Sequence, residues 1–105
     1  MEKIIKTVKD YDNLVNCGKL CVIDLFATWC GPCRMLAPII SSIANKSNDS
    51  FIVAKVDVDE IEEIAIRYSV NTIPTILYVK DGKLLEKTVG LRTEDQIMST
   101  IEKYI

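Results

Sequence analysis

Two cysteines stand two residues apart in the stretch Trp29-Cys30-Gly31-Pro32-Cys33. Sulfurs at this spacing can close a small disulfide ring, or they can supply two of the ligands of a metal ion. Three interpretations therefore compete: a redox-active dithiol, half of a metal site, and a pair of ordinary core cysteines. The neighbouring elements and the rest of the composition decide among them.

The segments on either side of the motif favour the redox interpretation. Residues 20–27 are almost continuously apolar, interrupted only by Asp24, which predicts a central strand buried on both faces. Apolar residues then recur at helical spacing over 36–44, and Pro32 suits the first turn of that helix. A cysteine at a helix N-terminus lies beside unpaired N–H groups, which favour the reactive thiolate. We therefore predict that Cys30 is the nucleophile.

The predicted reaction is a two-step exchange of disulfides. Cys30 attacks a sulfur of a partner disulfide and forms a mixed disulfide with it. Cys33, one helical turn away, then attacks Cys30 and releases the reduced partner. Pro32 stiffens the ring and positions the second sulfur, so one partner disulfide is reduced for each pair of cysteines oxidised.

Length and composition exclude several other classes of protein. At 105 residues, we expect one domain, residues 1–105. With 13 Lys and Arg against 15 Asp and Glu, the chain lacks the basic surplus of a nucleic-acid-binding protein. We find neither an export signal nor a membrane-spanning stretch, so we expect no membrane association and a cytoplasmic location. The absence of histidine excludes zinc sites of mixed Cys and His type and catalysis by a histidine base.

The other two cysteines, Cys17 and Cys21, bear on the metal interpretation. A tetrahedral site of four cysteines would need this second pair beside the first. An extended strand from Cys21 to Ala27 spans about 20 Å at roughly 3.3 Å per residue, which puts Cys21 at the wrong end. Zinc within one chain is disfavoured, whereas a metal shared between two chains stays possible. We interpret Cys17 and Cys21 as small buried or half-buried apolar residues.

Asp24 is a carboxylate within an apolar strand, where desolvation should raise its pKa. One interpretation gives it a buried partner, with Lys55 as the candidate because that lysine interrupts another apolar stretch. The other has Asp24 take the proton from Cys33, directly or through water, as Cys33 becomes the second nucleophile. The two interpretations are compatible.

The dipeptide Ile73-Pro74 precedes a predicted strand. Because proline has no backbone donor, this end of the strand cannot be fully paired. It is either an ordinary turn with a trans peptide bond or an exposed edge at Ile73 that pairs with an extended substrate.

The remaining patterns predict the order βαβαβαββα. Further strands are expected over residues 4–8, 51–56, 75–80 and 83–89, the last two joined by a hairpin at Asp81-Gly82. Further helices are expected after Asp10, after an Asp59/Glu62 capping box, and after a Thr93/Gln96 capping box. Right-handed crossovers then place helices on both faces of a mixed five-stranded sheet. The dithiol falls just beyond the carboxyl end of a central strand, where sites of open α/β sheets gather.

These residues together resemble the thioredoxin family over essentially the whole chain. The residues that carry the resemblance are the Trp29–Cys33 motif, Asp24, Lys55, Ile73-Pro74 and Gly90. It implies an α/β thioredoxin fold, a central mixed five-stranded sheet flanked by four helices. It also implies that Pro74 is cis and packs against the dithiol, that Trp29, Ile73 and Gly90 border a docking surface for substrate, and that Asp24 with Lys55 assists proton transfer at Cys33.

The resemblance further implies the activity and its partners. The protein would be a thiol-disulfide oxidoreductase, a monomeric protein-disulfide reductase that carries electrons in cell redox homeostasis. It would bind no cofactor or metal, and a thioredoxin reductase would recycle the Cys30–Cys33 disulfide, so NADPH is used only indirectly. Its clients would be proteins such as peroxiredoxins, ribonucleotide reductase and methionine sulfoxide reductases. The alternative is a non-catalytic metal-binding or interaction module on the same fold.

Three details separate this chain from relatives on the same fold. Glutaredoxins typically carry Pro-Tyr between the cysteines and protein disulfide isomerase domains carry Gly-His, so Gly31-Pro32 favours a reductant. Phe26 stands where many thioredoxins have a second tryptophan. Cys17 and Cys21 are extra cysteines that some relatives lack, and they leave side oxidation or dimerisation open.

Overall fold

The computed structural model describes residues 1–105, and five strands and four helices follow one another in the predicted order. The elements are β1 (Lys3–Ile4), α1 (Val8–Val15), β2 (Leu20–Phe26), α2 (Gly31–Asn45), β3 (Phe51–Asp57), α3 (Glu62–Arg67), β4 (Thr75–Lys80), β5 (Lys83–Val89) and α4 (Glu94–Tyr104).

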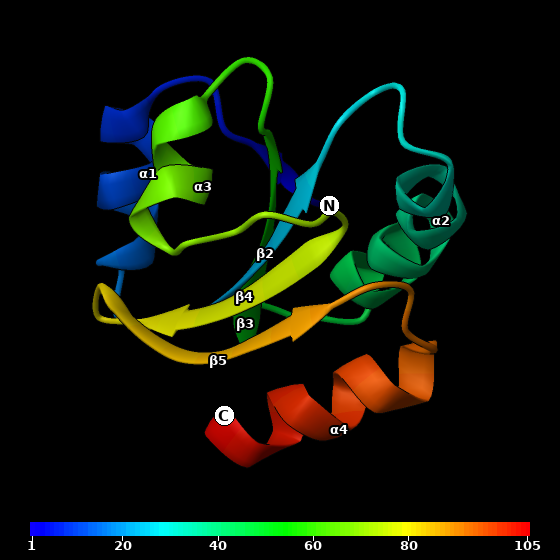
Figure 1. Ribbon diagram of the computed structural model, residues 1–105. Coiled ribbons are helices and arrows are strands. Elements are labelled where there is room, and N and C mark those ends of the chain that lie inside the picture. Colours follow the sequence, from blue (N-terminus) through cyan, green and yellow to red (C-terminus); the bar gives the residue numbers. More distant parts are fainter.

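The strands form one mixed sheet in the order β1-β3-β2-β4-β5 (Figure 1). The central strand β2 runs parallel to β3 on one side and antiparallel to β4 on the other. The mixed five-stranded sheet flanked by four helices is therefore confirmed. Because β2 has a neighbour on each side and helices on each face, its apolar sequence is what burial requires.

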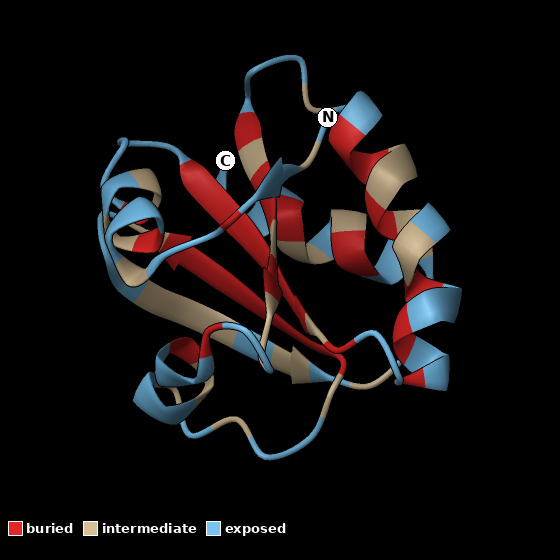
Figure 2. Cartoon of the chain, turned by 90° about the horizontal axis from the view of Figure 1, so that it is seen from above, coloured by how far each residue is buried: buried red, intermediate tan, exposed pale blue.

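Alternation along β2 sends its side chains into two separate cores. Cys21, Ile23 and Leu25 join one core together with residues of α1 and α3. Leu20 and Val22 join the other, with residues of α2 and α4. Figure 2 shows the central strands buried along most of their length and the helices buried on one side only.

Helix starts differ from the predictions at two places. The N-cap of α1 is Thr7, whose hydroxyl accepts the N–H of Asp10, and not Asp10 itself. The strand expected over 4–8 is correspondingly shorter, since it ends at Ile4. No side chain caps α3, so the predicted Asp59/Glu62 capping box is wrong. The capping box of α4 is confirmed, with both the Thr93 and Gln96 side chains bonded to backbone.

The predicted β4–β5 hairpin turns at Asp81 and Gly82, with φ of 52° and 74°. Both residues in the left-handed region give the twist that suits a two-residue hairpin. The Gly82 N–H donates to the carbonyl of Val15 at 2.9 Å, which ties the hairpin to the last turn of α1. The positive φ of Gly82 favours glycine, and a Cβ there would also lie 2.9 Å from the end of the Asn16 side chain, which would have to move.

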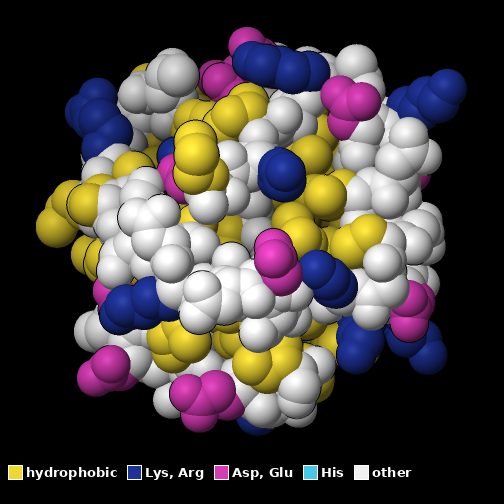
Figure 3. Space-filling model, turned by 180° about the vertical axis from the view of Figure 1, so that it is seen from behind, with side chains coloured by type: hydrophobic (Ala, Val, Ile, Leu, Met, Phe, Trp, Pro, Cys, Tyr) yellow, Lys and Arg dark blue, Asp and Glu magenta, His cyan; other side chains and the backbone are white.

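Two further observations concern the charge on the surface and the length of the helices. Acidic and basic side chains are interspersed on the face shown in Figure 3, without a patch of one sign. None of the helices is both long enough and apolar enough to cross a bilayer.

Candidate active site at the carboxyl end of β2

The two motif cysteines lie where β2 leads into α2, and they form a disulfide. Cys30 is the N-cap of α2, and its sulfur accepts the backbone N–H of Cys33 at 3.2 Å. Only 5% of Cys30 and 4% of Cys33 is exposed. After reduction, the same N–H and the positive end of the helix dipole would stabilise negative charge on the Cys30 sulfur.

A second loop lies against the dithiol, as the resemblance implies. The Ile73–Pro74 peptide bond is cis, and the carbonyl oxygen of Ile73 lies 3.9 Å from the Cys30 sulfur. Half-buried Ile73 packs on the small apolar cluster that contains both cysteines. The Pro74 carbonyl accepts the N–H of Gly90 at 2.8 Å, which brings the end of β5 to the same place.

Trp29 extends outward from this edge and is 67% exposed. Its indole N–H donates to the Asp59 carboxylate at 2.8 Å. The bond holds a large apolar ring in water beside the dithiol. Three further exposed apolar residues are near the site in sequence: Met35 follows Cys33 by two residues, and Val89 and Leu91 flank Gly90.

Asp24 lies on the same face of the sheet as Leu20 and Val22, the face that α2 covers. It is 1% exposed, and neither carboxyl oxygen has a hydrogen-bond partner. Burial raises the pKa of Asp24 to about 6, and Lys55 opposes this rise only in part. The predicted raised pKa is thus confirmed.

The predicted pairing of Asp24 with Lys55 is wrong at the level of direct contact. The two residues are register partners on β2 and β3. The Lys55 ammonium, however, lies over the Phe26 ring, 4.6 Å from its centroid. This cation–π contact holds the amine of half-buried Lys55 over the ring. Lys55 therefore acts on Asp24 through its charge alone.

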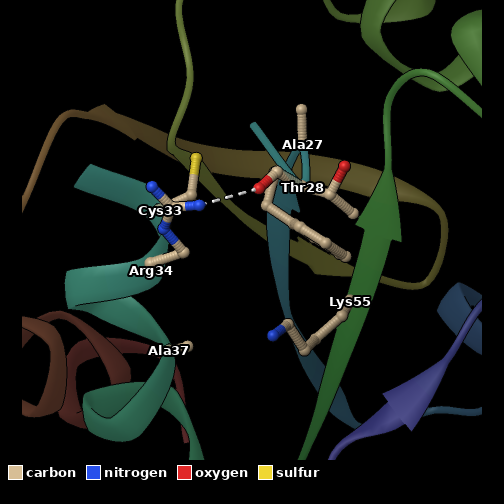
Figure 4. A pocket seen from close by; sticks show the side chains of 7 residues that line it. Ala27, Thr28, Cys33, Arg34, Ala37 and Lys55 are labelled. Atoms are coloured by element: carbon tan, nitrogen blue, oxygen red, sulfur yellow. Dashed lines mark hydrogen bonds between the residues drawn. The ribbon is translucent and has the colours of Figure 1, made fainter. Parts of the chain in front are cut away.

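A pocket of about 240 Å³ lies between Cys33 and Lys55, and Asp24 is not among the residues that line it. Cys33, Arg34 and Ala37 line it from α2, Lys55 lines it from β3, and Thr28 lies at its edge (Figure 4). The Arg34 guanidinium donates to the carbonyl of Thr28 at 3.4 Å. The pocket is large enough to hold water between Cys33 and half-buried Lys55, which is the register neighbour of Asp24.

Comparison with known proteins decides the family. The model of the Thioredoxin family matches residues 2–103. The chain belongs to the thioredoxin family. Mouse mitochondrial thioredoxin is 38% identical over 94 residues, which are 90% of this chain and 57% of the mouse protein, so the chain spans little more than half of that relative's length.

Solved structures agree with this assignment. The thioredoxin of Fasciola hepatica superposes with a TM-score of 0.90 at 39% identity, covering 98% of this chain and 99% of that one. Another similar chain comes from a structure on thiol resolution in the yeast mitochondrial 1-Cys peroxiredoxin via the glutathione and thioredoxin systems. It has a TM-score of 0.87 at 29% identity and covers 97% of this chain and 94% of that one.

The structure separates the four cysteines into two pairs. Cys21 lies near the amino end of β2 and Cys30 follows its carboxyl end, so the pairs do not converge. No group of three or more His, Cys, Asp or Glu side chains is arranged to hold a metal ion. Cys21 is buried as predicted, but Cys17 is exposed, which contradicts its predicted burial because it lies in the open α1–β2 loop.

Sequence reasoning missed two contacts of the site. The sequence pattern predicts that Asp59 caps a helix, whereas its carboxylate accepts the indole N–H of Trp29 from 30 residues away. Arg34, which lines the pocket beside Cys33, was assigned no role. The pattern Asp-x-x-Glu fits a capping box, and nothing local distinguishes it from an acceptor for a distant indole.

Proposed function

We propose that this member of the thioredoxin family is a protein-disulfide reductase in which Cys30 attacks and Cys33 resolves. The observation that supports it most is the N–H of Cys33 directed at the Cys30 sulfur at the start of α2. The same hydrogen bond stabilises a thiolate, so Cys30 is the better nucleophile of the pair. Attack on a client disulfide breaks its S–S bond and forms the Cys30–client bond, and the first client sulfur leaves as a thiolate that takes up a proton.

Asp24 serves the second step. With a pKa of about 6, its carboxyl group is mostly ionised at pH 7 and can accept the Cys33 proton, directly or through water in the pocket. The Cys33 thiolate then attacks the Cys30 sulfur, and the client's second sulfur leaves with the electron pair. Lys55 tunes this base through its charge.

Clients dock at the edge formed by Trp29, Ile73, Pro74 and Gly90. Gly31 and Pro32, both exposed, form the outer side of the dithiol loop. The carbonyl of Ile73, 3.9 Å from the Cys30 sulfur, is positioned to pair with an extended client segment. Exposed Trp29 supplies apolar contact area beside it.

The electron supply and the clients follow from the family. A thioredoxin reductase returns electrons from NADPH to the Cys30–Cys33 disulfide, and no cofactor is bound to this chain. Peroxiredoxins are the first client class to test, since a similar chain comes from work on a yeast peroxiredoxin. Ribonucleotide reductase and methionine sulfoxide reductases are the other expected classes. We further propose that residues 1–105 act as one monomeric domain in the cytoplasm, with the mitochondrion as the alternative compartment.

The deciding experiment is reduction of insulin with dithiothreitol as the electron source. We expect strong acceleration by the wild-type protein and the dithiothreitol background rate with Cys30→Ser. Reduced, metal-free wild-type protein that gives no acceleration would overturn the proposal. Stoichiometric metal in protein purified under reducing conditions would instead favour a metal-binding module.

A further inference from the structure

The proposed reductase mechanism leaves Cys17 and Cys21 without a role, yet the structure brings them together. The Cys21 sulfur lies 3.5 Å from the carbonyl oxygens of both Leu14 and Lys19. The backbone N–H of Cys17 donates to the same Leu14 oxygen at 3.1 Å. Cys17 also lies close enough to the Cys21 thiol to raise the pKa of that thiol. The two thiols are therefore neighbours at the amino end of β2.

The two thiols differ sharply in access. Cys17 is exposed, whereas Cys21 is fully buried in the core beneath α1. Residues 16–19, which connect α1 to β2, are all exposed. Gly18 has φ of +91°, and no atom lies within 4 Å of the place where a Cβ would stand, so this loop has open space around it. A reagent from solution meets Cys17 first and reaches Cys21 only through it.

The Cys30–Cys33 dithiol of the same molecule cannot reach this pair. Cys21 and Phe26 are five residues apart along an extended strand, which is about 17 Å at 3.3 Å per residue. In Figure 1 the α1–β2 connection lies beside the β4–β5 hairpin, at the opposite end of β2 from the start of α2. Any exchange at Cys17 is thus independent of the first dithiol.

We propose that Cys17 and Cys21 form a second thiol–disulfide exchange site, which accepts small disulfides of the glutathione disulfide class. The Cys17 thiolate attacks one sulfur of the small disulfide, whose S–S bond breaks, and one thiol is released after taking up a proton. The Cys21 thiolate then attacks the Cys17 sulfur and expels the second thiol. Two protein thiols are oxidised to one disulfide, and one small disulfide is reduced to two thiols.

The surroundings of Cys21 make the second step the slower one. Burial, and then the neighbouring Cys17, raise the pKa of the Cys21 thiol to about 12. Tyr11 of α1 is another titratable group that faces it; a tyrosine is uncharged near neutral pH, and burial raises the pKa of Tyr11 further. The mixed disulfide on Cys17 therefore forms first and accumulates before the internal disulfide replaces it.

The test uses the full chain carrying Cys30→Ser and Cys33→Ser, so the outcome does not depend on the reductase mechanism. This protein is reduced, exchanged into buffer and incubated with glutathione disulfide, and intact mass and peptide mapping follow the products over time. We expect one glutathionyl group on Cys17, later replaced by a Cys17–Cys21 disulfide.

Two further substitutions in the same background serve as controls. Cys17→Ser, at an exposed position, should abolish both products, since Cys21 is inaccessible. Cys21→Ala should leave the glutathionyl group on Cys17 indefinitely. A persistent adduct on Cys17 in the chain that retains Cys21, a Cys17–Cys17 dimer in place of the internal disulfide, or no reaction at Cys17 would each overturn the proposal.

Discussion

The two ends of strand β2 place the same side chain in opposite environments. Beyond the carboxyl end, the Cys30 sulfur receives a backbone N–H at the start of α2. At the amino end, the Cys21 sulfur lies against two backbone carbonyl oxygens, one of them from the last turns of α1. Donors stabilise a thiolate, and carbonyl oxygens stabilise the protonated thiol.

The polarity of the chain explains this difference. In a β–α unit the carboxyl end of a strand leads into a helix N-terminus, with its free N–H groups. The amino end of a strand follows a helix C-terminus, with its free carbonyl groups. A cysteine placed by chance at either end therefore acquires different chemistry, and this is a physical reason why thiol catalysis belongs at the carboxyl end.

The largest expected effect separates the two cysteines of the first dithiol. Cys33→Ser should leave a mixed disulfide between Cys30 and a client, because no thiol remains to resolve it. Cys30→Ser should give no adduct with the same client. Non-reducing electrophoresis with a peroxiredoxin or insulin checks this, and an adduct held by Cys33 in the Cys30→Ser protein would reverse the two roles.

A direct comparison of the two ends comes from alkylation of the reduced wild-type protein. A thiol with a pKa of about 12 is ionised in roughly one molecule in 100,000 at pH 7, so Cys21 should react slowest by orders of magnitude. Cys30 should react fastest, with exposed Cys17 between them. Timed iodoacetamide labelling with peptide mapping gives the order, and labelling of Cys21 before Cys30 would invalidate the contrast.

Asp24, between the two ends, gives the next largest effect, on stability. Its pKa rises from 3.8 in the unfolded chain to about 6 in the folded protein, so stability falls as pH rises through this interval and is constant above it. Asp24→Asn removes this loss and should raise the free energy of unfolding at pH 7 by up to about 3 kcal/mol.

The gain should shrink towards zero near pH 3.8, which urea unfolding at several pH values can measure. The same variant should release reduced client more slowly, because Cys33 loses its base. Equal client release by both proteins at pH 7 would remove Asp24 from the mechanism, even if the stability gain is observed.

Local patterns predicted most of the fold because they agree with the tertiary structure. The apolar residues 20–27, the Asp81-Gly82 turn and the Thr93/Gln96 capping box all depend on neighbours in sequence. The position of the dithiol at a strand–helix junction followed from the same patterns. In these segments the secondary structure that the local sequence favours is the one that tertiary packing requires.

The predictions that failed concern side chains whose contacts or exposure depend on how distant elements pack. Lys55 is the register neighbour of Asp24, but its ammonium lies over the Phe26 ring. Cys17 was expected to be buried, yet the loop around Gly18 faces solvent. The local spacing of residues predicts neither outcome, because the packing of the elements determines cation–π contacts and loop exposure.

The smallest expected effect tests Asp59, the residue whose predicted role was wrong. Asp59→Ala should lower the free energy of unfolding by less than about 1 kcal/mol, since it removes one exposed hydrogen bond to Trp29 and no helix cap. Thr93→Ala is the matched control, and it should cost about 1 kcal/mol by removing the cap of α4. Asp59→Ala should also change the fluorescence of Trp29, the only tryptophan, while Thr93→Ala should not. A loss from Asp59→Ala as large as that from Thr93→Ala, with unchanged fluorescence, would restore Asp59 as a cap of α3 and separate Trp29 from it.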